Sequence, residues 1–187
     1  MEKQVRNLFG TVPEEPEEYI LASQISQAEA KKYFIERMRV RRPEKTGIIW
    51  WNLLDGWPQM SDAVVDYYFV KKLAYDYIKR CQAPFSVCAD EFEDGMVRIY
   101  ACNDTLEEKK GNLIIKDGIT GECIKDVEFI AQKNTSSLIC SVDIDKTKQT
   151  ILTFHWEEGE NKGFNHYLVA DIPVSLDMYK KFLQSIS

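Results

Sequence analysis

The sequence predicts a mixed fold, in which a helix–strand–helix unit over residues 1–84 precedes an all-β sandwich over residues 85–187. Two patterns predict it. In the first part, apolar residues recur at helical spacing on both sides of one short apolar run, and in the second part short alternating segments are separated by turn residues. Because 44% of the residues are hydrophobic and 12% are aromatic, the chain can bury a core and is not expected to be disordered.

Two amphipathic helices are expected in the first part. The segment Pro13–Glu18 carries two prolines and four acidic residues. This composition suits a helix N-terminus, because proline is tolerated there and carboxylates complement the helix dipole. A second helix is predicted from about Asp66 to Arg80, where apolar residues follow an i, i+3, i+4, i+7 pattern. The apolar residues of the first helix recur as far as Pro43, and they are Leu21, Ile25, Ala28, Ile35 and Met38.

Between these helices lies the run Gly47–Asp62, which holds three of the four tryptophans. Its first half, from Ile48 to Asn52, has the composition of a buried strand, and its second half breaks into a loop at Gly56 and Pro58. A strand that ends in a loop carrying Trp, Asn and Asp side chains is a common way to build a site at the end of a sheet or barrel. A single strand buried on both faces needs neighbours, which this sequence does not obviously supply.

Seven short segments with strand character follow Pro84, and turn residues separate them. In one of them, Val97 and Ile99 face one way while Arg98 and Tyr100 face the other. Seven antiparallel strands in about a hundred residues indicate a two-sheet sandwich of immunoglobulin type. The segments are Phe85–Ala89, Met96–Cys102, Leu113–Lys116, Cys123–Phe129, Leu138–Ile144, Thr150–Trp156 and Phe164–Ile172.

Charge and composition argue against several classes of partner. The net charge of -6 argues against nucleic acid, and the one basic run, between Arg37 and Lys45, is better explained as a solvated helix end. No apolar run approaches the roughly 20 residues of a membrane helix, and the N-terminus has no signal-peptide core. We therefore expect a soluble, cytoplasmic protein that binds neither nucleic acid nor membranes.

No pattern in the sequence predicts a metal or a cofactor. The five cysteines have no C-x-x-C spacing and are expected to be reduced thiols. No carboxylate or cysteine cluster lies at ligand spacing around His155 or His166, so both histidines are expected at the surface or half-buried. The sequence also has no Ser-His-Asp arrangement, P-loop or dinucleotide motif.

Two interpretations of the clustered tryptophans stay open at this point. In the first, Trp50, Trp51 and Trp57 form an aromatic platform for the C–H faces of a sugar, and Asn52 and Asp55 bind its hydroxyls. In the second, they pack in the core and in turns, because strand alternation points Trp50 and Trp51 to opposite sides.

Asp55 and Asp62 are candidates for a glycosidase carboxylate pair. Their spacing of seven residues within one loop is unspecific. Capping or turn roles explain these two aspartates better.

A resemblance to a known family is carried by specific segments. The run Gly47–Asp62 contains the pattern Trp-x-x-x-Asp-x-Trp-Pro, and it is accompanied by Ala22–Ala28, Val65–Tyr68, Lys72, Ala74-Tyr75 and Pro84. These segments resemble the end of the catalytic barrel of glycoside hydrolase family 2, closest to its β-mannosidases. Downstream segments resemble the C-terminal sandwich domain of the same enzymes, and they are Asn103–Thr105, Gly111, Asn165–Leu168 and Ile172-Pro173.

This resemblance implies a large retaining exo-glycosidase with a (β/α)8 barrel. Residues 1–84 would then be the end of the barrel, as a helix-strand-helix remnant, and the immunoglobulin-like sandwich would support it. Trp51 would line the sugar subsite next to the catalytic nucleophile. Asn52 and Leu54 replace a glutamine and an asparagine that many members carry, which leaves the sugar preference open among mannosides, glucuronides and galactosides.

The resemblance also places both catalytic glutamates on earlier barrel strands, so no residue of this chain is predicted to be catalytic and the chain alone is expected to be inactive. The predicted substrate-binding residues are Trp51, Asn52, Asp55 and Trp57, and the expected partner is a β-linked oligosaccharide. Apolar surfaces shaped for other barrel strands would be exposed, which predicts self-association or a loose N-terminal segment. The alternatives are a non-catalytic carbohydrate-binding module that uses Trp51 and Trp57, and a protein-interaction module.

Overall fold

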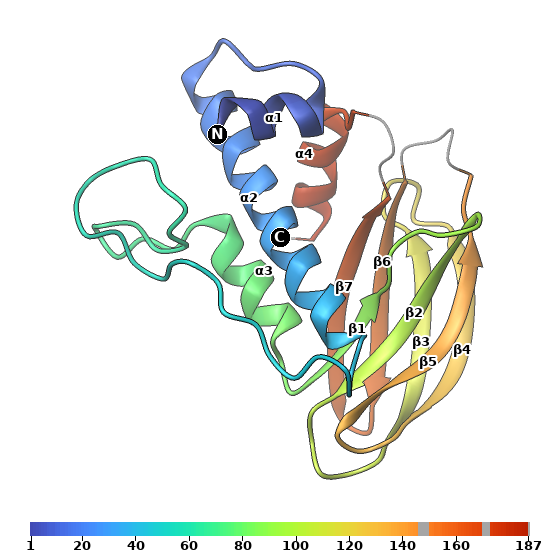
Figure 1. The fold of residues 1–187 in the computed structure, drawn as a ribbon. Helices are drawn as coiled ribbons and strands as arrows, with labels where there is room; N and C mark the ends of the chain where they lie inside the picture. The colour runs from blue at the N-terminus through green and yellow to red at the C-terminus, as the bar shows by residue number, and fades with distance from the viewer. Residues whose placement is uncertain (146–149, 170–172, 187) are drawn as a thin grey trace.

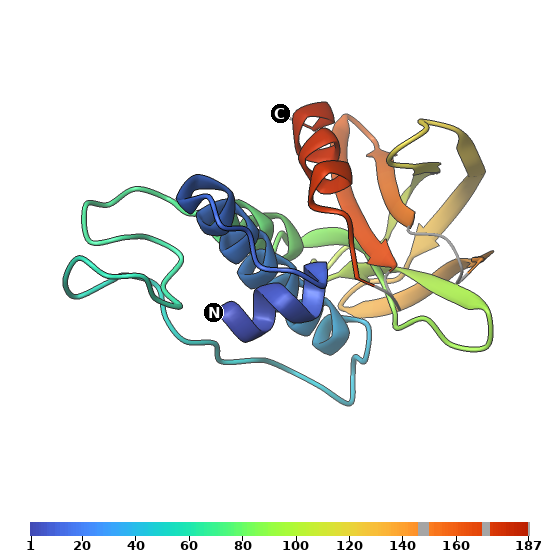
Figure 2. The ribbon, with the colours of Figure 1, turned by 90° about the horizontal axis from the view of Figure 1, so that it is seen from above.

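The computed structural model describes residues 1–145, 150–169 and 173–186, and it consists of a helical layer beside a β-sandwich (Figure 1). The C-terminal helix lies with the N-terminal helices and not at the far side of the sandwich (Figure 2). Within the described residues, no helix is long and apolar enough to cross a membrane. The helices are α1 (Glu2–Phe9), α2 (Pro16–Arg39), α3 (Leu73–Cys81) and α4 (Leu176–Ser185).

The long helix α2 confirms the first predicted helix. It begins at Pro16 and carries Glu17 in its first turn, where the carboxylate complements the helix dipole. Arg37 and Arg39 lie in its last turn, as the basic run predicts. One face of the helix is buried against the other helices and the sandwich, and the opposite face is exposed.

The prediction of a strand over Ile48–Asn52 is wrong. The segment is irregular, and the side chains of Ile49 and Trp51 are 99% and 80% exposed. A buried strand needs neighbours that bond its backbone and cover its faces, and no described strand lies beside this segment. The same apolar residues therefore lie in a long loop between α2 and α3, which extends away from the sandwich (Figures 1 and 2).

The second predicted helix is correct only in its second half, because α3 begins at Leu73 and not near Asp66. The Asp66 carboxylate accepts hydrogen bonds from the backbone N–H groups of Tyr68 (2.8 Å) and Val70 (2.9 Å). Between them, Phe69 has a φ of 65°. Such local side-chain bonds hold the backbone in a turn and compete with helix formation.

Helices α1 and α4 are not among the predicted elements. Helix α4 is capped by Ser175, whose hydroxyl accepts from the backbone N–H of Met178. Helix α1 ends at Phe9 and is followed by Gly10, which has a φ of 76° that glycine adopts without a steric cost. Both helices are short, and they are held by tertiary packing, with Phe9 and Phe182 buried in one cluster.

All seven predicted strands are present, and every pairing is antiparallel. They form a three-stranded sheet in the order β1-β2-β5 and a four-stranded sheet in the order β4-β3-β6-β7. The sequence predicts that the last segment reaches Ile172, and residues 170–172 lie outside the described residues. The strands are β1 (Phe85–Ala89), β2 (Met96–Asn103), β3 (Lys109–Asp117), β4 (Cys123–Ala131), β5 (Thr135–Asp143), β6 (Thr150–Glu158) and β7 (Asn161–Val169).

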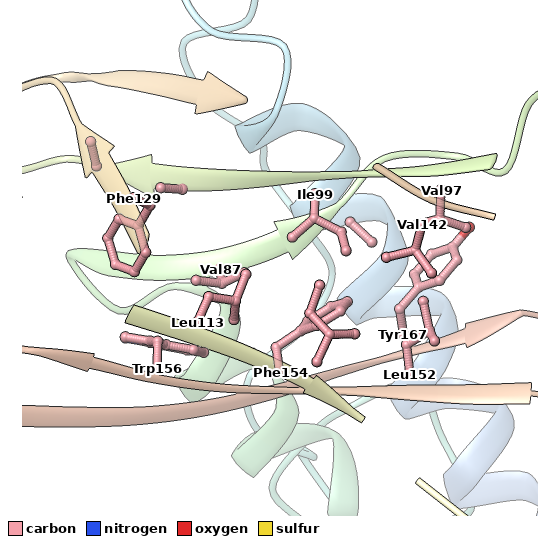
Figure 3. Close-up of a cluster of buried hydrophobic side chains, with 14 of the residues drawn as sticks. Val87, Val97, Ile99, Leu113, Phe129, Val142, Leu152, Phe154, Trp156 and Tyr167 are labelled. Carbon is pink, nitrogen blue, oxygen red and sulfur yellow. The ribbon is translucent and has the colours of Figure 1, made fainter. Parts of the chain in front are cut away.

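The core of the sandwich lies between the two sheets (Figure 3). Val87 and Ile99 from one sheet face Leu113 and Phe154 from the other, and all four are fully buried. This is the consequence of the period-2 alternation in each strand, which turns every second side chain inward.

One close approach in the sandwich requires glycine. A Cβ atom on Gly163 would lie 2.1 Å from Cε2 of Trp156 on the paired strand, so only a residue without a side chain fits beside this indole. The pairing of Gly163 with Trp156 thereby fixes where the large ring sits in the core.

The helical layer and the sandwich share a second apolar cluster. In it, Ile25 of α2 and Tyr179 of α4 are buried together with Ile151 of β6, and Phe164 of β7 packs against them. Because α4 comes from the end of the chain, the helical layer draws on both ends of the sequence. The division of the chain into domains at Pro84 stays a prediction.

Candidate functional site

The loop between α2 and α3 presents two of the predicted site residues to solvent. The side chains of Trp51 and Trp57 are 80% and 63% exposed. Asn52 is half-buried, and its amide nitrogen donates to the carbonyl of Leu54 at 3.3 Å. The peptide bond between Trp51 and Asn52 is cis. The two exposed indoles give this loop an aromatic surface. The Asn52 side chain contributes to the local fold of the loop through its hydrogen bond to Leu54.

Asp55, the third predicted site residue, is turned inward. It is only 3% exposed, and its carboxylate accepts hydrogen bonds from Ser61 Oγ and from Gln59 Nε2 (3.1 Å) on one oxygen. The other oxygen is paired with Lys72 Nζ at 3.1 Å. Burial alone would raise the pKa of Asp55, but the Ser61 hydroxyl and the Lys72 ammonium outweigh it and lower the pKa. Asp55 thus has the loop-capping role that the spacing favours.

Backbone bonds complete a small folded unit around this ion pair. The N–H of Asp55 donates to the carbonyl of Val65 at 3.1 Å, and the N–H of Val65 donates to the carbonyl of Leu53 at 2.9 Å. The N–H of Lys72 donates to the carbonyl of Val64 at 2.9 Å. The exposed Trp57 is therefore carried by a loop whose two ends are joined.

Helix α2 fixes the same loop from one side. Lys31 Nζ donates to the carbonyl of Trp51 at 2.5 Å and lies over the Trp50 ring, 5.1 Å from its centroid. The amide of Gln27 donates to the carbonyl of Asp62 at 2.6 Å. These contacts hold the backbone at Trp51 while its indole points into solvent.

A cavity of about 410 Å³ lies between α2 and the loop. Its walls include Ser23, Gln24 and Gln27 from the helix and Gln59 and Asp62 from the loop. Hydroxyl, amide and carboxylate groups of this kind donate to and accept from sugar hydroxyls. Trp51 and Trp57 do not line this cavity. The aromatic surface of the candidate site therefore lies on the loop, and the polar surface is shared by the loop and α2.

The structure does not support the candidate catalytic pair of Asp55 and Asp62. Asp62 is exposed, whereas the Asp55 carboxylate is buried with both oxygens bonded. A glycosidase acid requires a raised pKa, and the pKa of Asp55 is lowered. The loop can bind and orient, but these two aspartates are not arranged for acid catalysis.

His166 is not at the surface or half-buried, as the sequence predicts, but completely buried between the helices and β7. Its Nε2 lies 2.7 Å from Glu29 Oε1, and the hydroxyl of Tyr179 donates to the same oxygen. The Tyr179 hydroxyl also contacts that of Tyr77 at 2.8 Å. Sequence patterns could not show this contact, because Glu29 and His166 are 137 residues apart. His155, in contrast, is exposed as predicted.

These contacts determine the protonation of the pair. Burial lowers the pKa of His166 to about 4, although the Glu29 carboxylate opposes this. Burial would raise the pKa of Glu29, but His166 and Lys32 reverse the effect and lower it to about 2. At neutral pH the pair is therefore a neutral imidazole that donates its Nε2–H to a carboxylate.

A second buried ionic group lies one turn further along α2. Lys32 and Glu36 are each 1% exposed, and Lys32 Nζ lies 2.8 Å from Glu36 Oε2. The amide of Asn165 donates to Glu36 Oε1 at 2.6 Å and to the carbonyl of Val87 at 2.8 Å. Burial alone would lower the pKa of Lys32, but the carboxylates of Glu36 and Glu29 raise it. This group joins α2 to β1 and β7.

The cysteines are all free, and Cys81, Cys88 and Cys102 are buried. The described residues contain no group of three or more His, Cys, Asp or Glu side chains that could hold a metal ion.

Comparison with known proteins connects this chain to enzymes that act on sugars. No protein-family model matches the chain. Beta-mannosidase B from Thermothelomyces thermophilus is 35% identical over 80 residues, which are 40% of this chain and 9% of that protein.

Solved structures match over most of the chain. The beta-D-mannosidase from Dictyoglomus thermophilum matches with a TM-score of 0.78 and 26% identity, over 93% of this chain and 22% of that one. The exo-chitosanase CsxA from Amycolatopsis orientalis shares the fold with a TM-score of 0.68 and 14% identity, over 91% of this chain and 21% of that one. The chain thus spans about a fifth of the length of these solved structures. It is similar to one part of a glycoside hydrolase family 2 enzyme of the β-mannosidase kind, as its sequence predicts.

Proposed function

We propose that this chain supplies one wall of the substrate site of a retaining exo-glycosidase, a β-mannosidase that removes terminal β-linked sugars from oligosaccharides. The observation that carries this proposal is the exposure of Trp51 and Trp57 on a loop that the Asp55–Lys72 ion pair and Lys31 hold in place. Fixed aromatic faces beside polar groups are what a sugar site requires. A relative of similar fold, the exo-chitosanase CsxA, has been determined in complex with PNP-beta-D-glucosamine.

In this proposal the 187 residues bind the sugar but do not cleave it. Retaining hydrolysis needs two carboxyl groups about 5 to 5.5 Å apart on either side of the bond. The family resemblance places its two catalytic glutamates on earlier barrel strands, and Asp55 is already used within its loop. The sandwich then has a supporting role, since α2 and α3 pack on it through buried contacts such as Asn165 with Glu36.

Two further parts of the proposal concern partners and location. Exposed apolar side chains on the loop, including Leu53, Trp57 and Phe69, form a surface through which the chain alone would self-associate. The proposed location is the cytoplasm.

An activity assay tests the catalytic part of the proposal. The purified 187-residue polypeptide should not hydrolyse an aryl β-mannoside, since it supplies only one side of the site. Robust turnover that is lost in Asp55→Asn would contradict this and make the loop aspartates catalytic.

A stand-alone carbohydrate-binding module is the second candidate, and the exposure of Trp51 and Trp57 favours it as well. The coding sequence upstream of Met1 distinguishes the two. An open frame that encodes a nucleophile segment resembling Ser-Glu-Phe-Gly supports the enzyme, and an in-frame stop codon directly upstream supports the module.

A further inference from the structure

A second cavity, of about 500 Å³, lies beside the first, and the two share Gln4, Ser26 and Ala30 in their walls. Residues of α1, α2 and β7 line it together with Glu91 and Phe92, and none of residues 47–72 does. Its volume lies within the range of about 300 to 1,000 Å³ that small-molecule sites occupy. The cavity is therefore large enough for a small ligand and independent of the loop that carries Trp51 and Trp57.

Glu29 of α2 is a charged group in the wall of this cavity whose orientation is fixed by buried contacts. Its Oε1 atom accepts hydrogen bonds from His166 Nε2 and from the Tyr179 hydroxyl. The side chain keeps 12% exposure, and no hydrogen bond from a described residue reaches Oε2. A carboxylate that is held by two donors on one oxygen presents the other oxygen as a fixed acceptor.

The remaining wall combines polar and apolar groups. Asn7 of α1 and Ser26 of α2 supply an amide and a hydroxyl, and Leu8, Phe92 and Leu168 supply apolar surface. This mixture suits a ligand with hydroxyl groups on one side and C–H groups on the other.

Charge and hydrogen bonding narrow the ligand class. Lys32 also lines the cavity, but its ammonium is paired with Glu36 at 2.8 Å. An anionic ligand would be repelled by the carboxylates of Glu29 and Glu91, which line the same wall. A neutral ligand with several hydroxyls can donate to Glu29 and accept from Asn7.

We propose that this cavity is a second binding site, for a neutral polyhydroxylated ligand of monosaccharide size, and that Oε2 of Glu29 is its principal acceptor. The site is separate from the loop of Trp51 and Trp57 and does not require the proposed β-mannosidase function.

Nuclear magnetic resonance of the 15N-labelled 187-residue protein tests the proposal. The protein is titrated separately with D-mannose, with myo-inositol and with methylammonium chloride. We expect the first two to shift the side-chain amide of Asn7 and the backbone amides of Leu168 and Val169 in a saturable way. These shifts should persist in Trp57→Ala, which separates them from binding at the loop.

Two variants locate the binding. Glu29→Gln should weaken it about tenfold, because hydrogen bonds to a carboxylate are about twice as strong as those to a neutral amide. Asn7→Trp changes an exposed helix position at the cavity wall and should abolish binding by filling the space. Lys3→Trp is the matched control, since it adds the same side chain to α1 at an exposed position that does not line the cavity.

If Glu29→Gln does not fold, Asn7→Trp still tests the site, because it leaves the buried contacts of Glu29 unchanged. Absence of shifts in the wild-type protein, or equal shifts in Asn7→Trp, overturns the site. A response to methylammonium without a response to either polyol overturns the ligand class and makes the cavity a cation site.

Discussion

The ammonium of Lys72 lies 3.1 Å from Oδ2 of Asp55 and joins the two ends of the loop that carries Trp57. The Asp55 side chain is 1% exposed and that of Lys72 15% exposed, so water screens this pair only weakly. The exposed aromatic surface of the loop therefore depends on a buried electrostatic contact.

Replacing the cation should open the loop without unfolding the sandwich. In Lys72→Met, the Asp55 carboxylate loses its buried partner, which typically costs about 3 kcal/mol or more. We expect faster hydrogen exchange at the amides of Val65 and Lys72, whose bonds close the loop, and unchanged exchange in β3 and β6.

The neighbouring lysine offers a control for this prediction. Lys71 is exposed and its ammonium lies over the Tyr75 ring, 4.6 Å from the centroid. Lys71→Met removes the same charge from the same segment and should leave the exchange rates of the loop unchanged. Equal effects of the two substitutions would show that the Asp55 contact does not hold the loop.

Stability should fall in acid because of His166. In the folded protein its pKa is lowered from 6.5 to about 4, so the unfolded chain binds a proton that the folded protein does not. The free energy of unfolding should therefore decrease as the pH falls from 6.5 towards 4, by about 3 kcal/mol in total. Urea unfolding at a series of pH values measures this slope.

Substitution of each histidine separates their contributions to the slope. His166→Gln keeps a donor for Glu29 but cannot take up a proton, so the free energy of unfolding should change less between pH 6.5 and 4.5. The pKa of the exposed His155 ring is also lowered, by partial burial and by Lys116, so His155→Gln should remove only a smaller part of the slope. Below pH 4.5 stability should continue to fall in the wild-type protein and in His155→Gln, because the pKa of Glu29 is lowered to about 2 by His166 and Lys32 and its protonation is therefore destabilising. A slope that is unaffected by His166→Gln would contradict the buried pair.

The ion pair of Lys32 and Glu36 gives a prediction about coupling. Lys32→Met leaves a carboxylate buried without its cation and should destabilise the protein by about 3 to 5 kcal/mol. The double variant Lys32→Met with Glu36→Met removes both charges and should be more stable than Lys32→Met alone. Additive losses, measured by urea unfolding, would show that the two charges do not interact.

The parts of the fold that could be predicted from sequence are those that local patterns determine. The strands follow from alternation and turn residues, as in Val97 and Ile99, and α2 follows from its apolar spacing and its acidic start at Pro16. The run Ile48–Asn52 has the same local pattern as a buried strand, but neighbouring strands decide whether such a pattern forms one.

The site could be predicted only in part, for the same reason. The motif around Trp57 marks this loop as a candidate sugar site, but the sequence leaves open whether its tryptophans are exposed or packed. The capping role of Asp55 follows from its place in a loop. The contact of Glu29 with His166 depends on how α2 packs on β7, and no short-range spacing contains that information.

The most direct test of the account is a titration of tryptophan fluorescence with manno-oligosaccharides. Trp57→Ala removes the exposed ring, and Tyr68→Ala removes another exposed aromatic side chain of the same loop, 67% exposed, as the control. We expect a saturable change in the wild-type protein and in Tyr68→Ala that is lost in Trp57→Ala. The absence of a saturable change in the wild-type protein, or its persistence in Trp57→Ala, would contradict the role of this loop as the wall of a sugar site.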